Sequence, residues 1–326
     1  MLNSRYTYNR KPTIQLNPLQ LKMKKQVEQK IESEIYTRET VPCAVCMGSH
    51  FEQLAAKDRY GLDLSVVICK DCGLIQTNPR MNQHSYNAFY DIEYRPLYSG
   101  KDQPTEEYFR FQYNRGQKIW SYLTDSGVKL TADMFVLEVG CGAGGILLYF
   151  REKGCRVKGI DLGSSYIEYG KKQYNLDLHI GTIDTHIENH GDHPDLIIYS
   201  HVLEHFLDPT KEMRKAHEIL NNTGTLYINV PGVKNLKEGN MDFFQRLVLA
   251  HTYYFTLRTL VNLAENSGFI KLSGDEVVRA TFKKSTINNQ QSTMIIMMLC
   301  VIYIEQSACD YYTAFPLLTS ICFPRC

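Results

Sequence analysis

The sequence predicts an α/β protein whose main part is a parallel, doubly wound sheet, with a small metal-binding module before it. The first observation is an alternation of strand-like and helix-like segments over residues 135–230, because such alternation builds βαβ units. The second is a glycine-rich turn, Gly140–Gly145, directly after the first of these strands. The third is a pair of C-x-x-C motifs between residues 43 and 72. Right-handed crossovers bring the carboxyl ends of parallel strands to one edge of a sheet, so we expect a ligand to bind at that edge.

Residues 1–40 form a polar, net basic segment in which we expect a helix. Apolar side chains recur there at approximate helical spacing between lysines: Leu19, Leu21, Met23, Val27 and Ile31. This pattern predicts an amphipathic helix that packs on the rest of the protein. A helix on a membrane surface is the alternative, and four glutamates in the same stretch argue against it.

Residues 41–77 contain the two cysteine pairs, Cys43-x-x-Cys46 and Cys69-x-x-Cys72, which are separated by 22 residues. Each turn can present two sulfurs to one ion, and a hairpin between them, including the β-rich stretch Leu64–Ile68, would bring the turns together. The pattern predicts a zinc ribbon with a four-thiolate Zn²⁺ site; redox dithiols or free thiols are the alternatives. Four protein ligands leave no open coordination position, so this metal would stabilise the fold and take no part in a reaction.

Residues 78–130 are rich in aromatic side chains and contain prolines, which indicates a linker that passes into a helix over about Thr105–Leu123. Residues 131–280 contain the alternating pattern. Strands are expected at Phe135–Val139, Arg156–Asp161, Leu176–Ile180, Asp195–Ser200 and Thr225–Val230, and helices at Ile146–Lys153, Ser164–Tyr174, Pro209–Leu220 and Thr256–Ser267.

Residues 281–326 form an atypical tail. No glycine occurs beyond Gly274, and four cysteines appear without pair spacing: Cys300, Cys309, Cys322 and Cys326. A helical cap, a disordered end and a change of reading frame in the gene all agree with this composition. We therefore assign the tail no function.

Composition excludes several classes of protein. With 44% hydrophobic and 22% charged residues, the chain can build a globular core. The 36 Lys and Arg residues against 35 Asp and Glu argue against a dedicated DNA coat or a polybasic membrane binder. The longest apolar run, Met294–Ile304, is shorter than the roughly 20 residues that span a bilayer, and the N-terminus lacks an apolar signal core. We expect a cytoplasmic protein, in which ten cysteines favour metal binding over disulfides.

The glycine-rich turn suits a nucleotide-like ligand. Glycines let the backbone turn tightly and approach a ligand, and the following helix N-terminus supplies free N–H groups. The next predicted strand ends in Asp161, 21 residues after Gly140, as expected of a carboxylate that holds a ribose diol. Glu138, two residues before Gly140, would repel a pyrophosphate and suits a ligand with a cationic amino acid end.

Through Glu138, Gly140, Gly142 and Gly144 the chain matches the motif E/D-x-G-x-G-x-G, and the sequence resembles the class I S-adenosylmethionine-dependent methyltransferases. The resemblance covers roughly residues 135–232 and implies a Rossmann-like sheet with S-adenosylmethionine as methyl donor. It also implies further cofactor-binding residues: Asp161 at the ribose, Thr182 and Ile183 against the adenine, and His201 after the fourth strand. A Rossmann-like domain that binds another nucleotide is the alternative.

The predicted ribbon and the aromatic stretch after it add a second resemblance. Over Cys43–Tyr98 the chain is similar to methyltransferases of deoxysugar and surface-polysaccharide pathways, some of which act on nucleotide-linked keto-sugars. The resemblance implies a small-molecule acceptor, a sugar nucleotide.

The segment His201-Val-Leu-Glu204-His205 permits two interpretations. It spells H-x-x-E-H, an inverted zinc-peptidase signature that needs a continuous helix, but a strand precedes it and Asp208-Pro209 follows, which indicates a loop. In a methyltransferase, this loop would lie beside the donor methyl, where His205 is our first candidate for the general base, with Glu204 beside it. The alternative for Glu204 and His205 is a hydrogen-bonded pair that fixes the loop.

His251 is the second candidate catalytic histidine. It begins the sequence His251-Thr-Tyr-Tyr-Phe ahead of a predicted helix, where the methyltransferase resemblance implies the acceptor pocket. A surface histidine is the alternative. No G-x-S-x-G motif occurs to support a nucleophilic serine.

The sequence thus predicts an enzyme that transfers a methyl group from S-adenosylmethionine to carbon or oxygen of a small, nucleotide-linked sugar. An RNA acceptor held by the ribbon is one alternative. The near-zero net charge and the absence of an Asn/Asp-Pro-Pro-Tyr element after the fourth strand argue against RNA. A catalytically silent binding protein whose ribbon docks a partner is the other.

Overall fold

The computed structural model describes residues 4–101, 103–190, 192–234 and 242–285. The predicted apolar run and the four cysteines of the tail lie outside these described residues. Among the residues that are described, no helix is both long enough and apolar enough to cross a bilayer.

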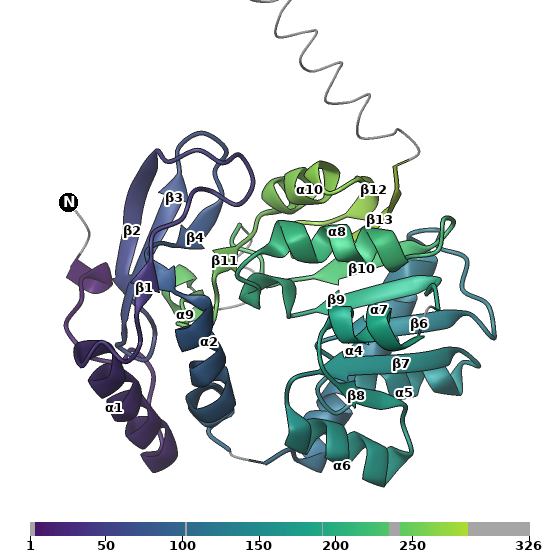
Figure 1. The fold of residues 1–326 in the computed structure, drawn as a ribbon, viewed down its shortest axis with the longest axis horizontal. Helices are drawn as coiled ribbons and strands as arrows, with labels where there is room; N and C mark the ends of the chain where they lie inside the picture. Colours follow the sequence, from purple (N-terminus) through teal and green to yellow (C-terminus); the bar gives the residue numbers. More distant parts are fainter. Residues whose placement is uncertain (1–3, 102, 191, 235–241, 286–326) are drawn as a thin grey trace, which may run out of the picture. The chain divides into compact units, whose positions relative to one another are not determined.

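A seven-stranded sheet is the centre of the part after residue 130 (Figure 1). Its order is β8-β7-β6-β9-β10-β13-β12, and the first five of these strands are parallel to one another. The strands are β6 (Phe135–Val139), β7 (Arg156–Asp161), β8 (Leu178–Ile180), β9 (Leu196–Ser200), β10 (Thr225–Asn229), β12 (Phe269–Gly274) and β13 (Arg279–Lys284). The predicted doubly wound α/β fold is confirmed.

The last two strands are an addition to the predicted sheet. β13 runs antiparallel to both β10 and β12 and extends past residue 280, where we expected the sheet-forming segment to end. Ala280 and Phe282 of β13 are fully buried, which explains why the strand stays in the sheet. Both strands alternate apolar and polar residues weakly, so their sequence pattern does not reveal them.

The order of the strands creates one switch point. From β6 the chain winds outward to β7 and β8, and then returns to β9 on the other side of β6. Ligands bind in such sheets at the carboxyl ends of the strands that flank this reversal. The two segments that leave these ends begin at Gly140 and His201.

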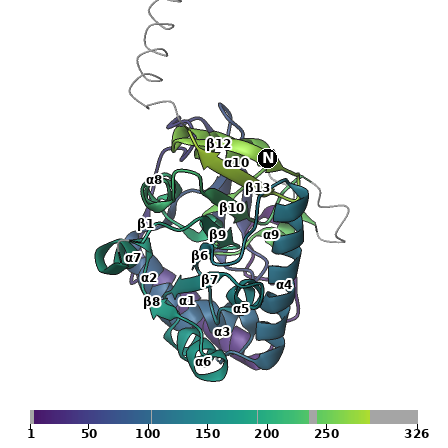
Figure 2. The ribbon, with the colours of Figure 1, turned by 90° about the vertical axis from the view of Figure 1, so that its right-hand side faces the viewer.

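Helices cover both faces of this sheet, as Figure 2 shows with the sheet viewed from its side. On one face the core contains Leu137 and Val139 of β6 together with residues of α8 (Pro209–Ile219) and α10 (Leu257–Asn266). On the other face, the core includes Val136 and residues of α4 (Glu106–Asp125), α5 (Gly145–Glu152) and α6 (Ser164–Tyr174). β6 and β9 are buried on both faces, and apart from Glu138 of β6 and the terminal Ser200 of β9 their residues are apolar or aromatic. The remaining helices of this part are α7 (Ile183–His190) and α9 (Phe243–Arg246).

A second, antiparallel sheet holds the cysteine pairs. Its order is β11-β4-β3-β2, with β2 (Phe51–Lys57), β3 (Asp63–Cys69), β4 (Ile75–Thr77) and β11 (Tyr253–Tyr254). β11 comes from the far later part of the chain and pairs with β4 (Figure 1). Apolar side chains of both parts also share one core, for example Leu64 with Phe244. The two parts therefore belong to one compact unit that ends at Lys284.

The N-terminal residues and the aromatic segment are largely helical. The helix α1 (Pro18–Glu32) begins at a capping box of Asn17 and Gln20 and buries Met23 and Val27.

Over residues 83–99, where we expected a linker, the structure has α2 (Gln83–Phe89), a π-helical turn (Tyr90–Tyr94) and α3 (Arg95–Ser99). Asn82 caps the first of these helices, and Tyr86, Tyr90 and Tyr94 pack inward, whereas Tyr98 is exposed. Two short strands, β1 (Arg38–Glu39) and β5 (Arg80–Met81), pair with each other.

Candidate active site and metal centre

The glycine-rich turn leaves the carboxyl end of β6 in a conformation that needs glycine. Gly140, Gly142 and Gly144 have φ angles of 73°, 55° and 79°, in the left-handed region. A Cβ atom on Gly140 would also lie 2.5 Å from Cγ2 of Val202, in the segment after β9. Any larger residue at position 140 would push apart the two segments that flank the switch point.

Asp161, at the end of β7, is held against this turn. Its Oδ2 accepts the N–H of Gly142 at 2.8 Å, and its Oδ1 accepts the N–H of Gly163 at 2.7 Å. Each carboxylate oxygen keeps a further lone pair for a hydroxyl donor. The structure thus brings together the predicted turn and the predicted ribose-binding acid.

Glu138 is a buried carboxyl group under the turn. It lies on β6 with 2% of its surface exposed, and its Oε2 has no hydrogen-bond partner among the described residues. Burial, reinforced by the charge of Asp161 and opposed by Arg115, raises the pKa of Glu138 well above its usual value. A cationic group of a ligand beside Glu138 would offset this cost, so the site fits a ligand with an ammonium end.

The other three predicted cofactor residues are distributed differently. Thr182 is exposed just before α7, whereas Ile183 is fully buried in the core of the sheet. His201 follows β9 with a φ of 58°, and its Nδ1 lies 3.9 Å from Oε1 of Glu204. The structure therefore brings His201 toward the candidate catalytic residues, whereas the Ile183 side chain packs in the hydrophobic core.

Glu204, His205 and His251 form a buried cluster at the carboxyl end of β9. Glu204 and His205 end a 3₁₀ turn (Leu203–His205), and His251 lies just before β11. The His205 and His251 rings are nearly perpendicular with centroids 4.8 Å apart, and Nε2 of His205 lies 3.8 Å from Oε1 of Glu204. The histidines of the H-x-x-E-H sequence are thus not on a continuous helix, as expected for a loop.

The hydrogen bonds of His205 indicate which ring nitrogen is protonated. Its Nδ1 lies 3.0 Å from the carbonyl oxygen of Ala250 and 2.5 Å from the hydroxyl of Tyr90. The carbonyl can only accept, so Nδ1 carries the hydrogen and Nε2 keeps its lone pair. That lone pair is the one on the side of Glu204.

Burial shifts the pKa values of His205 and Glu204 in the directions that favour their neutral forms. It lowers the pKa of His205 to about 3 and raises the pKa of Glu204 to about 8. Neither carboxyl oxygen of Glu204 has a hydrogen-bond partner among the described residues. Near neutral pH the pair is uncharged, and an imidazolium at His205 would be stabilised once Glu204 is ionised.

The aromatic segment supplies site residues that the sequence pattern did not reveal. Tyr94 stacks on Tyr90 with centroids 4.3 Å apart, and its ring meets that of His205 at 5.7 Å. The next residue, Arg95, has Nη2 3.7 Å from Oδ1 of Asp161. The sequence signal for these residues is the density of tyrosines in the segment, which we interpret as a linker. Local spacing does not indicate which distant residue a side chain contacts.

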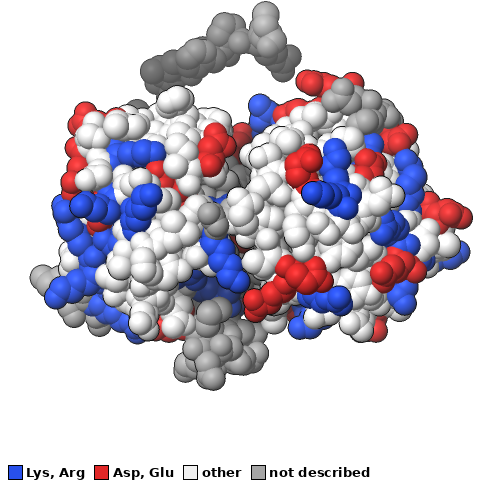
Figure 3. Space-filling model, turned by 90° about the horizontal axis from the view of Figure 1, so that it is seen from below, with Lys and Arg blue, Asp and Glu red and all other residues white. Residues whose placement is uncertain are grey.

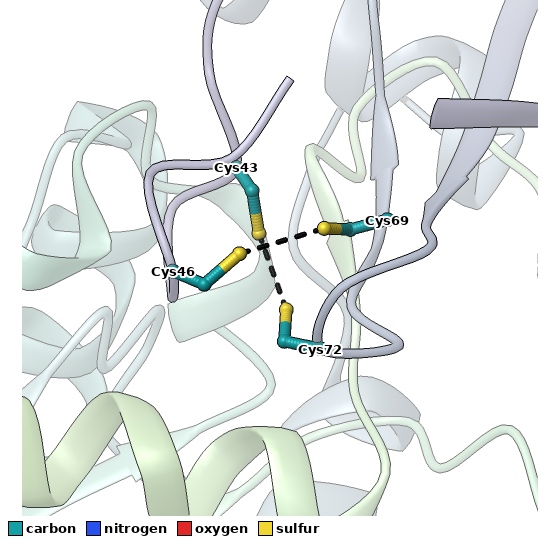
Figure 4. Close-up of side chains that lie close together, drawn as sticks. All are labelled: Cys43, Cys46, Cys69 and Cys72. Carbon is teal, nitrogen blue, oxygen red and sulfur yellow. Dashed lines mark hydrogen bonds between the residues drawn. The ribbon is translucent and has the colours of Figure 1, made fainter. Parts of the chain in front are cut away.

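The four predicted zinc ligands converge on one point (Figure 4). The sulfurs of Cys43 and Cys72 lie 3.4 Å apart, and those of Cys46 and Cys69 lie 3.5 Å apart, with no disulfide among them. Tetrahedral Zn²⁺ with Zn–S bonds near 2.3 Å holds its sulfurs about 3.8 Å apart. The donor set and its spacing therefore fit a four-thiolate zinc site.

The two cysteine turns also share one backbone pattern. In each turn the first cysteine donates its N–H to the carbonyl five residues later, and its own carbonyl accepts the N–H four residues later. The four bonds are Cys43 to Gly48, Met47 to Cys43, Cys69 to Leu74 and Gly73 to Cys69. The residue after the second cysteine is left-handed in both turns, Met47 with a φ of 59° and Gly73 with 81°. Two equivalent turns facing each other explain how the sulfurs form a compact tetrad.

Replacing Glu204 with glutamine should change how stability depends on pH. Between about pH 4.5 and 8 the unfolded carboxyl is ionised while the folded one stays protonated, so the folded state binds more protons and the free energy of unfolding falls as the pH rises. Glutamine does not titrate. We therefore expect the stability of Glu204→Gln relative to wild type to rise across this window, by up to about 1.4 kcal/mol per pH unit.

Urea unfolding at pH 5, 6, 7 and 8 measures this difference. Glu168→Gln on the exposed face of α6 is the matched control and should show a smaller change. A relative stability of Glu204→Gln that falls with rising pH would contradict the buried, protonated carboxyl.

Comparison with known proteins decides the family. A family model described as a methyltransferase domain matches residues 111–273, half of the chain. The chain belongs to this methyltransferase family. The resemblance that the sequence predicted is thus confirmed at the level of the family.

This methyltransferase has curated relatives that match over part of their length. It is 26% identical over 102 residues to the ubiquinone biosynthesis O-methyltransferase of Yersinia enterocolitica serotype O:8, a match that covers 30% of this chain and 42% of that protein. For the Yersinia pestis (strain Pestoides F) protein of the same name, the match is 25% over 99 residues and covers 29% and 41%. The match therefore spans less than half the length of these relatives.

Solved structures are similar at lower identity. The magnesium protoporphyrin IX methyltransferase of Synechocystis PCC 6803 has a TM-score of 0.43 at 14% identity, over 62% of this chain and 98% of that one. An S-adenosylmethionine-dependent methyltransferase of Clostridium acetobutylicum has a TM-score of 0.43 at 12% identity, over 61% and 99%.

Proposed function

We propose that this methyltransferase transfers a methyl group from S-adenosylmethionine to carbon or oxygen of a small acceptor, a nucleotide-linked sugar. The observation that carries the proposal is the arrangement at the switch point. A nucleotide-type loop leaves β6, and Glu204 and His205, which follow the neighbouring strand β9, form a buried cluster with His251. Donor and acceptor sites would thus meet at one sheet edge.

The donor side is assigned to Glu138, the glycine-rich turn and Asp161. Glu138 offers a buried carboxyl to the ammonium group of the donor, and Asp161 offers free lone pairs to the ribose hydroxyls. When bound, S-adenosylmethionine would supply an electrophilic methyl group. Arg95, which lies beside Asp161 here, would have to share or leave that carboxylate when the ribose binds.

The acceptor side is assigned to the histidine cluster. Nε2 of His205 takes the proton from an acceptor hydroxyl or from a carbon next to a carbonyl, while Nδ1–H stays bonded to the Ala250 carbonyl. The carboxylate of Glu204, 3.8 Å away, stabilises the imidazolium that results. The hydroxyl of Tyr90 positions the His205 ring at Nδ1, away from the Nε2 atom that faces Glu204.

The burial of this cluster supports a small acceptor. Glu204 and His251 are 1% and 6% exposed, and Tyr86 of α2 closes the cluster by donating to the carbonyl oxygen of His205 or Ala250, 2.6 Å from each. A base in an RNA strand would have to be flipped into this space. The resemblance of the ribbon and the aromatic segment to deoxysugar methyltransferases then favours a sugar.

The four-cysteine centre is assigned to one structural Zn²⁺. Its four thiolates leave no position for a substrate, so the metal would stabilise the fold. Asn266 of α10 donates to the carbonyl of Val45, inside the first cysteine turn, at 2.9 Å, so the centre is also tied to the methyltransferase part.

Donor binding tests the first half of the proposal. Asp161→Ala should weaken binding of S-adenosylhomocysteine, measured by calorimetry, by about 1–3 kcal/mol, because charge-assisted hydrogen bonds to the ribose are lost. Asp161→Asn keeps the shape of the side chain and removes its charge, so it distinguishes the effect of the charge from the effect of packing. Asp125→Ala, at an exposed position at the end of α4, should bind like wild type.

Tight binding of NAD without binding of S-adenosylhomocysteine would overturn the donor assignment. The acceptor is tested by turnover with S-adenosylmethionine and a panel of nucleotide-linked keto-sugars, with a ubiquinone precursor, magnesium protoporphyrin IX and an RNA transcript beside them, since the relatives are named for the first two. Methylation of one of those three and of no sugar nucleotide would reject the sugar.

A further inference from the structure

We propose that Arg59 and Arg246 bind the diphosphate of the acceptor, an inference that rests on the proposed function and deepens it. Arg59 follows β2, and Arg246 is the last residue of α9. Among the described residues, neither guanidinium has a carboxylate within 4.0 Å, although both side chains are half-buried. Two desolvated cations without a counter-ion need an anion from outside the chain.

The contacts of Arg59 orient its guanidinium without neutralising it. Nη1 donates to the carbonyl of Gln245 at 3.2 Å, and Nη2 donates to the hydroxyl of Tyr60 at 2.6 Å. The group lies over the rings of Tyr60 and Tyr98, at 4.9 and 5.3 Å from their centroids. Its Nε is buried and has no partner among the described residues. A group held in this way is preorganised for an oxyanion.

Arg246 shares the unpartnered Nε of Arg59, because its Nε is also buried without a partner in the described part of the chain. Arg59 is tied to both chain neighbours of Arg246, because its Nη1 donates to the carbonyl of Gln245 at 3.2 Å and its main-chain N–H donates to that of Leu247 at 2.9 Å. Burial lowers the pKa of Arg246, and the repulsive charge of Arg59 lowers it further. A phosphate or diphosphate between them would turn this repulsion into two attractive contacts.

The acid beside Arg59 in the chain is already occupied. Oδ1 of Asp58 accepts the N–H groups of Tyr60 and Leu62, both at 2.9 Å, and Oδ2 accepts that of Leu249 at 3.2 Å. Burial raises the pKa of Asp58 to about 7, and the charge of Arg59 opposes this rise. Asp58 ties the turn after β2 to the segment before His251, and in the described part of the chain its hydrogen bonds go to backbone N–H groups and to neither arginine.

The arginine pair lies close to the candidate catalytic cluster. The rings of Tyr98 and Tyr94 are 5.7 Å apart, and those of Tyr94 and His205 are also 5.7 Å apart, so an unbroken row of rings joins Arg59 to His205. After burial and His205, the charges of Arg59 and Arg246 contribute to the lowered pKa of His251. In a nucleotide-linked sugar the diphosphate is attached directly to the sugar ring, so a diphosphate at the arginines would direct the ring toward the histidines.

The surface of the molecule agrees with this direction of approach. Figure 3 shows a hollow between the two parts of the face that it presents, with Lys and Arg side chains on its left side and Asp and Glu side chains along its right edge. The net charge of the chain is only +1, so this accumulation is local. An anionic group would be drawn to it.

Calorimetry on the full-length, zinc-loaded protein with S-adenosylhomocysteine present tests the inference. Wild type should bind thymidine, uridine or guanosine diphosphate at least about ten-fold more tightly than the matching nucleoside, because only the diphosphate reaches the arginines. Arg59→Gln and Arg246→Gln should each weaken binding of that diphosphate about ten-fold or more, and Arg246→Lys should weaken it less.

Arg214→Gln, which removes the same charge from the exposed side of α8, should bind the diphosphate like wild type. Equal affinity of wild type for nucleoside and nucleoside diphosphate, or unchanged affinity in both glutamine variants, would overturn the inference, and so would tighter binding of an RNA oligonucleotide than of any nucleoside diphosphate. The comparison of ligands on wild type needs no variant to fold. Binding of S-adenosylhomocysteine in the same samples reports on the proposed function separately, since it does not involve either arginine.

Discussion

His205→Ala should reduce turnover by roughly 10²–10⁴-fold, the loss expected for a missing general base, while the affinity for S-adenosylhomocysteine stays nearly unchanged. The reason is geometric, because Nε2 of His205 is unprotonated and faces Glu204, whereas the donor residues Glu138 and Asp161 lie on the neighbouring strands β6 and β7. Steady-state kinetics with the identified acceptor, together with calorimetry for the donor, measure both quantities.

The pH profile separates a chemical role from a structural one. Turnover by wild type should rise as Glu204 ionises near pH 8, since the carboxylate then stabilises the imidazolium. High pH should partly restore His205→Ala if the acceptor can ionise unaided. A variant that is merely misfolded would lose donor binding and would not recover at high pH.

His251→Ala and Tyr90→Phe are the controls for His205. If His251 lines the acceptor pocket, His251→Ala should raise the KM for the acceptor more than it lowers kcat. Tyr90 is a positioning residue, so its phenylalanine variant should shift the pH profile and keep most of the turnover. Equal turnover by wild type and His205→Ala would move the proton transfer elsewhere, with His251 next.

Cys43→Ser should lower the zinc content from about one ion per chain and abolish turnover, with donor binding retained. Structural zinc sites contribute folding free energy directly, so losing one thiolate loosens the sheet around them. Here that sheet includes β11, and Thr77 at the end of β4 holds the backbone of His251 and Thr252 by hydrogen bonds of 2.9 Å. Loss of the metal should therefore disturb the acceptor side, at His251, before it disturbs the donor side.

Metal analysis, thermal unfolding and calorimetry with S-adenosylhomocysteine measure these three effects. Cys155→Ser is the matched control, because Cys155 is also buried but lies apart from the four-cysteine centre, just before β7. It should keep its zinc and its turnover. Wild-type protein prepared without chelator that contains no zinc would remove the metal site, and a Cys43→Ser variant with full turnover would remove its link to the acceptor side.

Much of the fold could be predicted from local patterns. The strands β6 and β9 are buried on both faces, so each appears as a short apolar run, and α6 and α8 show helical periodicity. The glycine-rich turn could be recognised because the left-handed φ at Gly140, Gly142 and Gly144 excludes other residues. The two cysteine turns could be recognised because each contains its whole geometry within six residues.

Some elements escaped prediction because their stability comes from distant partners. β11 is only two residues long and exists by pairing with β4, about 180 positions earlier in the chain. β12 and β13 stay in the sheet because β13 pairs with β10 and buries Ala280 and Phe282. The helical turns over residues 83–99 are fixed by packing of their tyrosines against later segments, and nothing in their own periodicity indicates this.

The sequence by itself determined the α/β sheet, the position of a nucleotide-type loop at its edge and the grouping of the four cysteines, because each depends on the order and spacing of neighbouring residues. Only the tertiary structure decided which side chains meet. Tyr90 reaches His205 across 115 positions, Arg95 reaches Asp161, and Arg59 reaches Gln245, the residue before Arg246. Such contacts depend on how the two sheets share a core, and the free energy of that packing is spread over many buried contacts that no local pattern encodes.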